Sequence, residues 1–296
     1  MSAPDTFSSG DAQILDRGYR KYDGPRTGVQ GAVRAVVTHS AQRALGMRRS
    51  IWAKILPVAT IGFAYLPAIV FVGVLALFPK AETADILLPT YGDYYGFIIS
   101  AIMVFVALVA PEVLCTDRRT GMLGVYLAAP LDRDSYLFAK AVSIGAVLSI
   151  VCLGPPLLML VANVLQSTGP DGVGDIALTF VRVLATGLVE TLLFTGITMG
   201  VTSLTDRKAI ASAAIILLFL VSISITGTLD VAGLPDGVYV FAPTLLGLEL
   251  APRVHGELAP IMNGVPSITV WLAWAAWTFG GFALARNRLH HLPVTR

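Results

Sequence analysis

Six long apolar segments constrain the fold of this 296-residue chain more than any other feature of its sequence. At about 1.5 Å per residue, each segment is long enough to cross the hydrocarbon layer of a membrane, about 30 Å thick, with some tilt. A membrane strand would instead alternate apolar and polar residues over about ten positions, and these segments do not alternate. The sequence therefore predicts an all-α polytopic membrane protein with six transmembrane helices, at residues 55–78, 96–114, 141–164, 178–204, 209–228 and 267–285.

The small share of charged residues supports this prediction. Charged residues make up 14% of the chain, whereas a soluble domain contains roughly 25%. The two cysteines, Cys115 and Cys152, lie in apolar surroundings and predict no disulfide framework. Residues 1–24 are polar and lack the hydrophobic core of a signal peptide, so we expect the mature chain to begin at residue 1.

The placement of Lys and Arg predicts the orientation. Of the 21 such residues, 18 fall in residues 1–54, in the loops after the second and fourth segments, and in the C-terminal tail. Because cytoplasmic loops are enriched in basic residues, we expect a plasma-membrane (cell inner membrane) protein with both termini in the cytoplasm. The chain then divides into a cytoplasmic segment, a transmembrane domain and a cytoplasmic tail, at residues 1–54, 55–285 and 286–296.

Residues 29–51 have the pattern of an amphipathic helix that leads into the first span. At 100° per residue, Arg43 is the one basic exception to an otherwise apolar face. A basic amphipathic helix beside a span favours the headgroup layer, so we predict an interfacial entry helix. Contact with a cytoplasmic partner subunit is the alternative that the sequence leaves open. The face comprises Val29, Val33, Val36, Val37, Ser40, Ala44, Met47 and Ile51.

The loop between the second and third spans, residues 111–140, is too long for a turn and too apolar for a solvated linker. Its residues 122–127 predict a short helix along the membrane surface, which either docks into a groove of a soluble protein or only seals the bundle. The candidate coupling residues in this loop are Asp117, Arg118, Gly121, Met122, Leu123 and Tyr126, of which Met122, Leu123 and Tyr126 are the candidate anchors.

A longer pattern crosses this loop: an acidic residue with arginines, a glycine, a short apolar stretch, and then P-x-x-R-x-x-Y-x-x-x-K. It consists of Asp117, Arg118, Arg119, Gly121, Leu127, Pro130, Arg133, Tyr136 and Lys140. Residues 16–26 add a cytoplasmic lead-in, and six spans with an amphipathic entry helix follow. In these features the chain resembles the permease subunits of bacterial ABC transporters of the type 2 exporter (ABC-2) class.

The resemblance implies partners. Two permease copies, identical or related, would pair around a pathway, and two ATP-binding subunits beneath them would contact the entry helix and the loop after the second span. ATP and Mg would then bind in those partner chains, because no GxxxxGK[ST] phosphate-binding loop occurs in this sequence. An apolar pathway favours a small amphipathic substrate (a drug, lipid or peptide), with ion extrusion or service to an assembly pathway as alternatives. We expect membrane lipid, and no nucleic acid, among the partners.

Four residues in or beside the spans are candidates for a gate or pathway: Glu112, Pro155, Pro156 and Glu190. A carboxylate near mid-membrane is costly, so Glu190 is either a functional group or a neutral one hydrogen-bonded to Thr186, Thr191 or Thr195. Pro155 and Pro156 remove backbone donors and predict a break in the third span. Glu112 is predicted to lie at the cytoplasmic mouth of the pathway, where it either gates the pathway or is simply a solvated side chain. Segment 229–266 is predicted to lie on the external side, where it either re-enters the membrane surface or caps the pathway as a lid.

Two other classes of protein fit the sequence less well. An intramembrane enzyme needs a nucleophile with its base, or clustered carboxylates or histidines. The histidines, at positions 39, 255, 290 and 291, lie outside the predicted spans, and no HExxH or GxSxG motif occurs. A secondary transporter usually contains internal repeats and midplane ionisable clusters, and neither is evident. The sequence therefore predicts a transport subunit with no catalytic and no metal-binding residues of its own.

Overall fold

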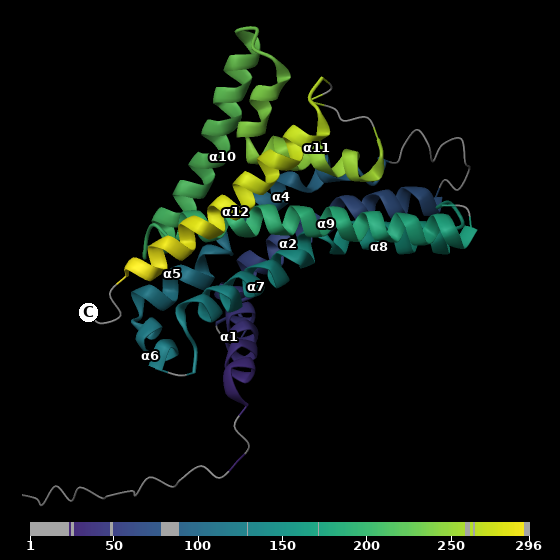
Figure 1. Cartoon of the computed structure of the whole chain (residues 1–296). Helices are drawn as coiled ribbons and strands as arrows, with labels where there is room; N and C mark the ends of the chain where they lie inside the picture. The colour runs from purple at the N-terminus through teal and green to yellow at the C-terminus, as the bar shows by residue number, and fades with distance from the viewer. Residues whose placement is uncertain are drawn as a thin grey trace, which may run out of the picture.

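The computed structural model describes residues 24, 27–47, 50–77, 89–128, 130–170, 172–257, 261, 262 and 264–292. All the regular elements in these ranges are helices (Figure 1). They are α1 (Gly28–Ala44), α2 (Ile51–Leu77), α4 (Tyr94–Leu108), α5 (Pro111–Arg119), α6 (Met122–Ala128), α7 (Arg133–Cys152), α8 (Gly154–Leu165), α9 (Gly172–Thr202), α10 (Lys208–Val231), the 3-10 helix η1 (Asp236–Phe241), α11 (Pro243–His255) and α12 (Ser267–His291).

The six predicted spans are confirmed, as helical segments long and apolar enough to cross a membrane. They are Ile51–Leu77, Tyr94–Arg119, Arg133–Leu165, Gly172–Thr202, Lys208–Val231 and Ser267–His291. The third begins eight residues before its predicted start because Asp132 caps it: the Asp132 carboxylate accepts a hydrogen bond from the Ser135 backbone N–H at 2.8 Å. The sixth runs to His291, so His290 and His291 lie in its last turn rather than beyond it.

The third span is broken where the sequence predicts it. Helix α7 ends at Cys152 and α8 begins at Gly154, followed by two prolines. Pro156 has no N–H to donate to the carbonyl oxygen of Cys152, four residues earlier. The hydroxyl of Tyr95 on α4 donates to that oxygen instead, at 2.9 Å. The break is therefore held by a side chain from a neighbouring span.

Helices α9 and α12 pack with their backbones in contact. A Cβ at Gly196 would lie 2.8 Å from the Cα of Thr278, and a Cβ at Gly200 would lie 3.0 Å from the Cα of Gly281. Glycines spaced four residues apart let two membrane helices approach until their backbones touch. The packing of α12 on α9 thus depends on the absence of side chains at these positions.

The entry helix is shorter than predicted, and protein covers the middle of its apolar face, while Val29 at its start is 49% exposed. Helix α1 ends at Ala44, and Gly46 follows with φ +69°, a backbone conformation that favours glycine. Val36 packs with Leu131 and Ala139, while Met47 and Ile51 lie outside the helix and are exposed. The predicted helix over 29–51 was wrong at its C-terminal end.

Different helices and turns lie at the two ends of the bundle. In Figure 1, α5, α6, the start of α10 and the C-terminal end of α12 lie together at the lower left, and α1 descends from the same region beside α7. The turn between α8 and α9 lies at the far right. The end that carries α5 and α6 is the end where the predicted cytoplasmic loops meet.

Candidate functional site

A cluster of buried charged residues joins three helices at the end that carries α5 and α6. Its centre is Asp117 of α5, which is 1% exposed. The Asp117 carboxylate forms ion pairs with Lys140 of α7 at 2.5 Å and Arg43 of α1 at 3.3 Å. It also accepts a hydrogen bond from the Tyr136 hydroxyl at 3.1 Å, and Lys140 donates to the Ser40 hydroxyl at 2.7 Å. These contacts fix α5 between α1 and α7.

Glu112 extends the cluster to a fourth helix. Its carboxylate pairs with Lys208, the first residue of α10, at 2.9 Å, and with Arg43 at 3.8 Å. Arg43 therefore lies between two acidic residues that are five positions apart on one helix. Glu112 is 8% exposed, so the structure places it within an ion-pair network rather than in solvent. We call the set Arg43, Glu112, Asp117, Lys140 and Lys208 the basal ion cluster.

The sequence contained one signal for this cluster. Arg43 breaks the apolar face of the entry helix, and a charge on a buried face needs a partner of opposite sign. Lys140 and Tyr136 belong to the pattern of the loop, but their spacing alone does not show that both point at Asp117. The network depends on α1 and α7 lying side by side, which no local sequence pattern predicts.

The short helix α6 presents a different face from the one predicted. Gly121, with φ +71°, lets the chain turn from α5 into α6. Leu123 is 8% exposed and packs with Tyr136 and Leu289. Met122 and Val125 point away from the bundle, with 37% and 62% of their surface exposed.

Tyr126, the third predicted anchor, is half-buried beside the basal ion cluster. Its ring centroid lies 5.7 Å from that of Tyr136 and 5.5 Å from the ammonium of Lys140. Burial, followed by the nearby charge of Asp117, raises the pKa of Tyr126. Leu123 and Tyr126 thus attach α6 to the helical bundle, and its free face is formed by Met122 and Val125.

Basic side chains cap the C-terminal ends of two spans near α6. Arg118 donates to the Ser203 carbonyl oxygen at 2.7 Å and to that of Thr202 at 3.4 Å, after the end of α9. Arg133 donates to the carbonyl oxygens of Leu289 and Leu292 at 2.8 and 3.2 Å, at the end of α12. A cation at a helix C-terminus satisfies free carbonyl groups and the helix dipole. Arg118, a candidate coupling residue, therefore contacts α9.

Glu190 lies in α9 with no exposed surface, and neither carboxylate oxygen has a hydrogen-bond partner among the described residues. The predicted hydrogen bonds to threonine are not made; Thr186 donates to the Arg182 carbonyl oxygen instead, at 2.9 Å. Helix α11 covers the carboxyl group, and a Cβ at Gly247 would lie 2.6 Å from Glu190 Oε2. Pro155 and Pro156, the neighbouring candidates, are buried at the start of α8.

The external segment predicted as a lid folds into the bundle through η1 and α11. Glu249, with no exposed surface, accepts hydrogen bonds from Arg253 at 2.6 and 3.0 Å and from the Ile261 and Met262 backbone N–H groups at 3.2 and 3.1 Å. His255 ends the helix, and burial, with the nearby charge of Arg182, lowers its pKa to about 4. These bonds hold the segment together, and helix α11 packs against α9 and α4.

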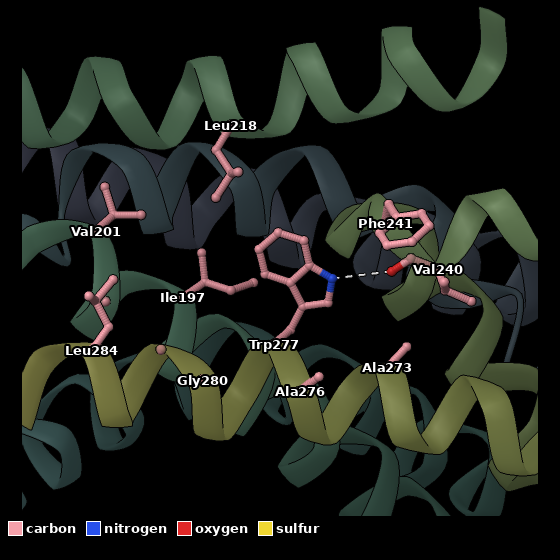
Figure 2. A pocket seen from close by; sticks show the side chains of 12 residues that line it. Ile197, Val201, Leu218, Val240, Phe241, Ala273, Ala276, Trp277, Gly280 and Leu284 are labelled. Atoms are coloured by element: carbon pink, nitrogen blue, oxygen red, sulfur yellow. Dashed lines mark hydrogen bonds between the residues drawn. The ribbon is translucent and has the colours of Figure 1, made fainter. Parts of the chain in front are cut away.

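An apolar pocket of about 420 Å³ opens between α9, α10, η1 and α12. Figure 2 shows Trp277 in its centre, with the indole N–H donating to the Val240 carbonyl oxygen at 3.1 Å. Ile197, Leu218 and Phe241 form its walls. None of its lining side chains is charged, so the pocket suits alkyl or aromatic groups. Across the described residues, no three His, Cys, Asp or Glu side chains are grouped to hold a metal ion.

Six helices that are long and apolar enough to cross a membrane make the chain a multi-pass membrane protein. The sequence matches the profile of a family described as ABC-2 family transporter protein over residues 12–264. The chain therefore belongs to the ABC-2 family of transporter membrane proteins, whose permeases are typically non-catalytic and pair with ATP-binding subunits. No curated protein sequence matches the chain significantly.

Proposed function

We propose that this chain is the permease subunit of an ATP-driven exporter. With a second permease, identical or related, it forms the pathway for a small amphipathic substrate, and two ATP-binding subunits dock on its cytoplasmic face and hydrolyse ATP. The observation that carries this proposal is the free face of α6, formed by Met122 and Val125. Helix α6 directly follows α5, which the basal ion cluster fixes to α1, α7 and α10. An exposed apolar face on a rigid base is suited to a partner's groove.

The basal ion cluster couples the docking helix α6 to the membrane spans. Leu123 and Tyr126 attach α6 to the bundle, and α5 is joined by ion pairs to α1, α7 and α10. Separating a buried pair leaves an uncompensated charge, which costs more than moving the paired helices together. A displacement of α6 by a partner would therefore move the bases of these helices as one unit. In this role Asp117, Arg118 and Gly121 position α6 and do not contact the partner.

The apolar pocket supports an amphipathic substrate over an inorganic ion. Ion pathways are lined by carbonyl groups or charged side chains, which the lining residues around Trp277 do not supply. We also propose that Glu190 and the break in the third span contribute to the pathway or its gate. Pro155 and Pro156 form the bend of this span between α7 and α8.

Docking is tested by changing the free face of α6. Met122→Asp and Val125→Asp place a charge where a partner's apolar groove would close, so we expect both variants to lose co-purified ATPase activity while the permease keeps its thermal stability. Val173→Asp, at an 85% exposed position outside α6, is the matched control and should retain the ATPase. Full ATPase recovery with both α6 variants would contradict docking through this face.

The orientation is tested by cysteine labelling. We propose cytoplasmic termini, residues 1–54 and 286–296 on the cytoplasmic side of a transmembrane domain at 55–285, because of the uneven placement of Lys and Arg. In spheroplasts, cysteines at Asp93 and Val173 should react with an impermeant maleimide, and cysteines at Thr120 and Arg207 should react only after permeabilisation. Cys115 and Cys152 are buried and stay in place. The reverse labelling pattern would invert the topology.

A further inference from the structure

A second groove lies on the bundle's outer surface, between α7, α9 and α12, and encloses about 830 Å³. It is separate from the pocket around Trp277 and shares no lining residue with it. Gly145 and Ala146 of α7 keep the groove wide because they have little or no side chain. Phe138 and Leu188, which are 63% and 51% exposed, stand at its edges.

The groove has one charged end, and the rest of its lining is apolar except for the hydroxyl groups of Ser149, Thr191 and Thr195. At the charged end, Arg286 of α12 forms two hydrogen bonds with the Asp134 carboxylate, at 2.8 and 2.9 Å, and His290 lies 3.0 Å from the same carboxylate. A second hollow, lined by Arg286, Asn287 and His290, adjoins this end. The opposite end is marked by Ser149 on α7.

The length of the groove matches one leaflet of a membrane. Ser149 follows Asp134 by fifteen residues on a single helix, a separation of about 22 Å along the helix axis. Half of a bilayer, headgroups included, measures about 20–22 Å. Asp134 and Arg286 lie at the ends of their spans on the α6 side, so the charged end is at headgroup depth and the apolar part is at acyl-chain depth.

The charges at that end complement a headgroup that carries both signs. The side chains of Asp134 and Arg286 are 46% and 63% exposed, and an exposed ion pair contributes little stability, so a headgroup can insert at small cost. A guanidinium binds phosphate through paired hydrogen bonds, and a carboxylate binds an ammonium group. An anionic headgroup would satisfy Arg286 and leave Asp134 opposite a like charge.

From this geometry we infer that the groove between α7, α9 and α12 binds one zwitterionic glycerophospholipid of the leaflet on the α6 side. Its phosphate contacts Arg286, its ammonium contacts Asp134, and an acyl chain lies along Ala141, Gly145 and Ser149. The lipid is a bound component of the permease on a surface distinct from the substrate pocket.

The test measures lipid retention by the purified permease with its co-purifying subunits. After delipidation in mild detergent, the sample is titrated with dioleoyl phosphatidylethanolamine, dioleoyl phosphatidylglycerol or the chain-free headgroup glycerophosphoethanolamine. Bound lipid is counted by native mass spectrometry and the melting temperature is recorded. We expect phosphatidylethanolamine to be retained and to raise the melting temperature, phosphatidylglycerol to do so less, and the free headgroup to have no effect.

Two kinds of variant separate the acyl contact from the headgroup contact. Ala146→Phe fills the groove and should lose the bound phosphatidylethanolamine, whereas Ala177→Phe, at an exposed alanine of α9 outside the groove, should retain it. Asp134→Asn and Arg286→Gln leave the walls unchanged and should abolish the preference for phosphatidylethanolamine, which keeps the proposal testable if Ala146→Phe does not fold.

Three results would overturn the inference. The first is retention of phosphatidylethanolamine by a folded Ala146→Phe variant at the level of the unmodified protein. The second is equal retention of the two phospholipids, or an equal effect of the free headgroup. The third is a disulfide between two copies carrying Phe138→Cys in the native membrane, which would assign the groove to a permease dimer.

Discussion

Replacing Asp117 with asparagine is expected to lower the free energy of unfolding of the permease by about 3–5 kcal/mol, because the change leaves a buried positive charge without its partner. Lys140 is 1% exposed, and it would keep its hydrogen bond to the Ser40 hydroxyl and its contacts with the rings of Tyr126 and Tyr136, none of which carries a compensating charge. Arg43 loses its 3.3 Å contact at the same time. The measurement is thermal or denaturant unfolding of the solubilised protein, which should also show weaker attachment of α1.

A double-mutant cycle shows whether the lost energy belongs to the pair. Lys140→Met removes the unpartnered charge while keeping an unbranched side chain, so the double variant should be more stable than Asp117→Asn alone. Asp93→Asn is the control: Asp93 is exposed and its side chain caps no backbone group, so the expected change is within about 0.5 kcal/mol. Additive losses in the cycle would show that Asp117 and Lys140 do not interact.

Replacing Glu190 with leucine is expected to have the opposite effect on stability, a gain of about 1–3 kcal/mol, because a buried polar group without partners is removed. Transport-coupled ATP turnover should fall. We expect this loss because a carboxyl group that is costly inside a membrane span is a candidate for a role in transport. Glu190→Gln keeps the size but cannot ionise, so it should lower turnover without the gain in stability.

Glu249 supplies the matched control, because its carboxylate also has no exposed surface. Glu249→Leu leaves Arg253 and two backbone N–H groups without their partner, so it should destabilise the protein where Glu190→Leu stabilises it. A Glu190→Leu variant that melts at a lower temperature would show that the carboxyl group has stabilising partners. Full turnover by Glu190→Gln would show that its ionisation is not used.

The spans could be predicted from the sequence because each needs only its own residues: an apolar segment of sufficient length must be a helix inside a membrane. The break at Pro155 and Pro156 is equally local, since proline removes a donor wherever it stands. The apolar and basic pattern of residues 29–51 gave the start of the entry helix, but its end depends on Gly46 turning the chain towards α2.

The candidate site could be predicted only in part, because its contacts join residues far apart in the chain. Asp117 and Tyr126 were identified in the right loop, yet their roles depend on Lys140 and Arg43 reaching them from other helices. Periodicity did not show which face of α6 is free, since a seven-residue helix has too few turns to mark one. Glu190 was singled out by the cost of a carboxyl group in a span, whereas its lack of hydrogen-bond partners among the described residues is a property of the packed structure.

The contact between α9 and α12 determines which parts of this permease can move relative to one another. Where backbones touch at Gly196 and Gly281, no side chain can change rotamer to absorb a shift, and a small slide would bring Cβ atoms of neighbouring residues into the other helix. The fourth and sixth spans are therefore expected to move as one rigid unit during transport. The pathway would then open and close at helix interfaces whose side chains can change rotamer, such as those of α10 and of the third span, which is broken between α7 and α8.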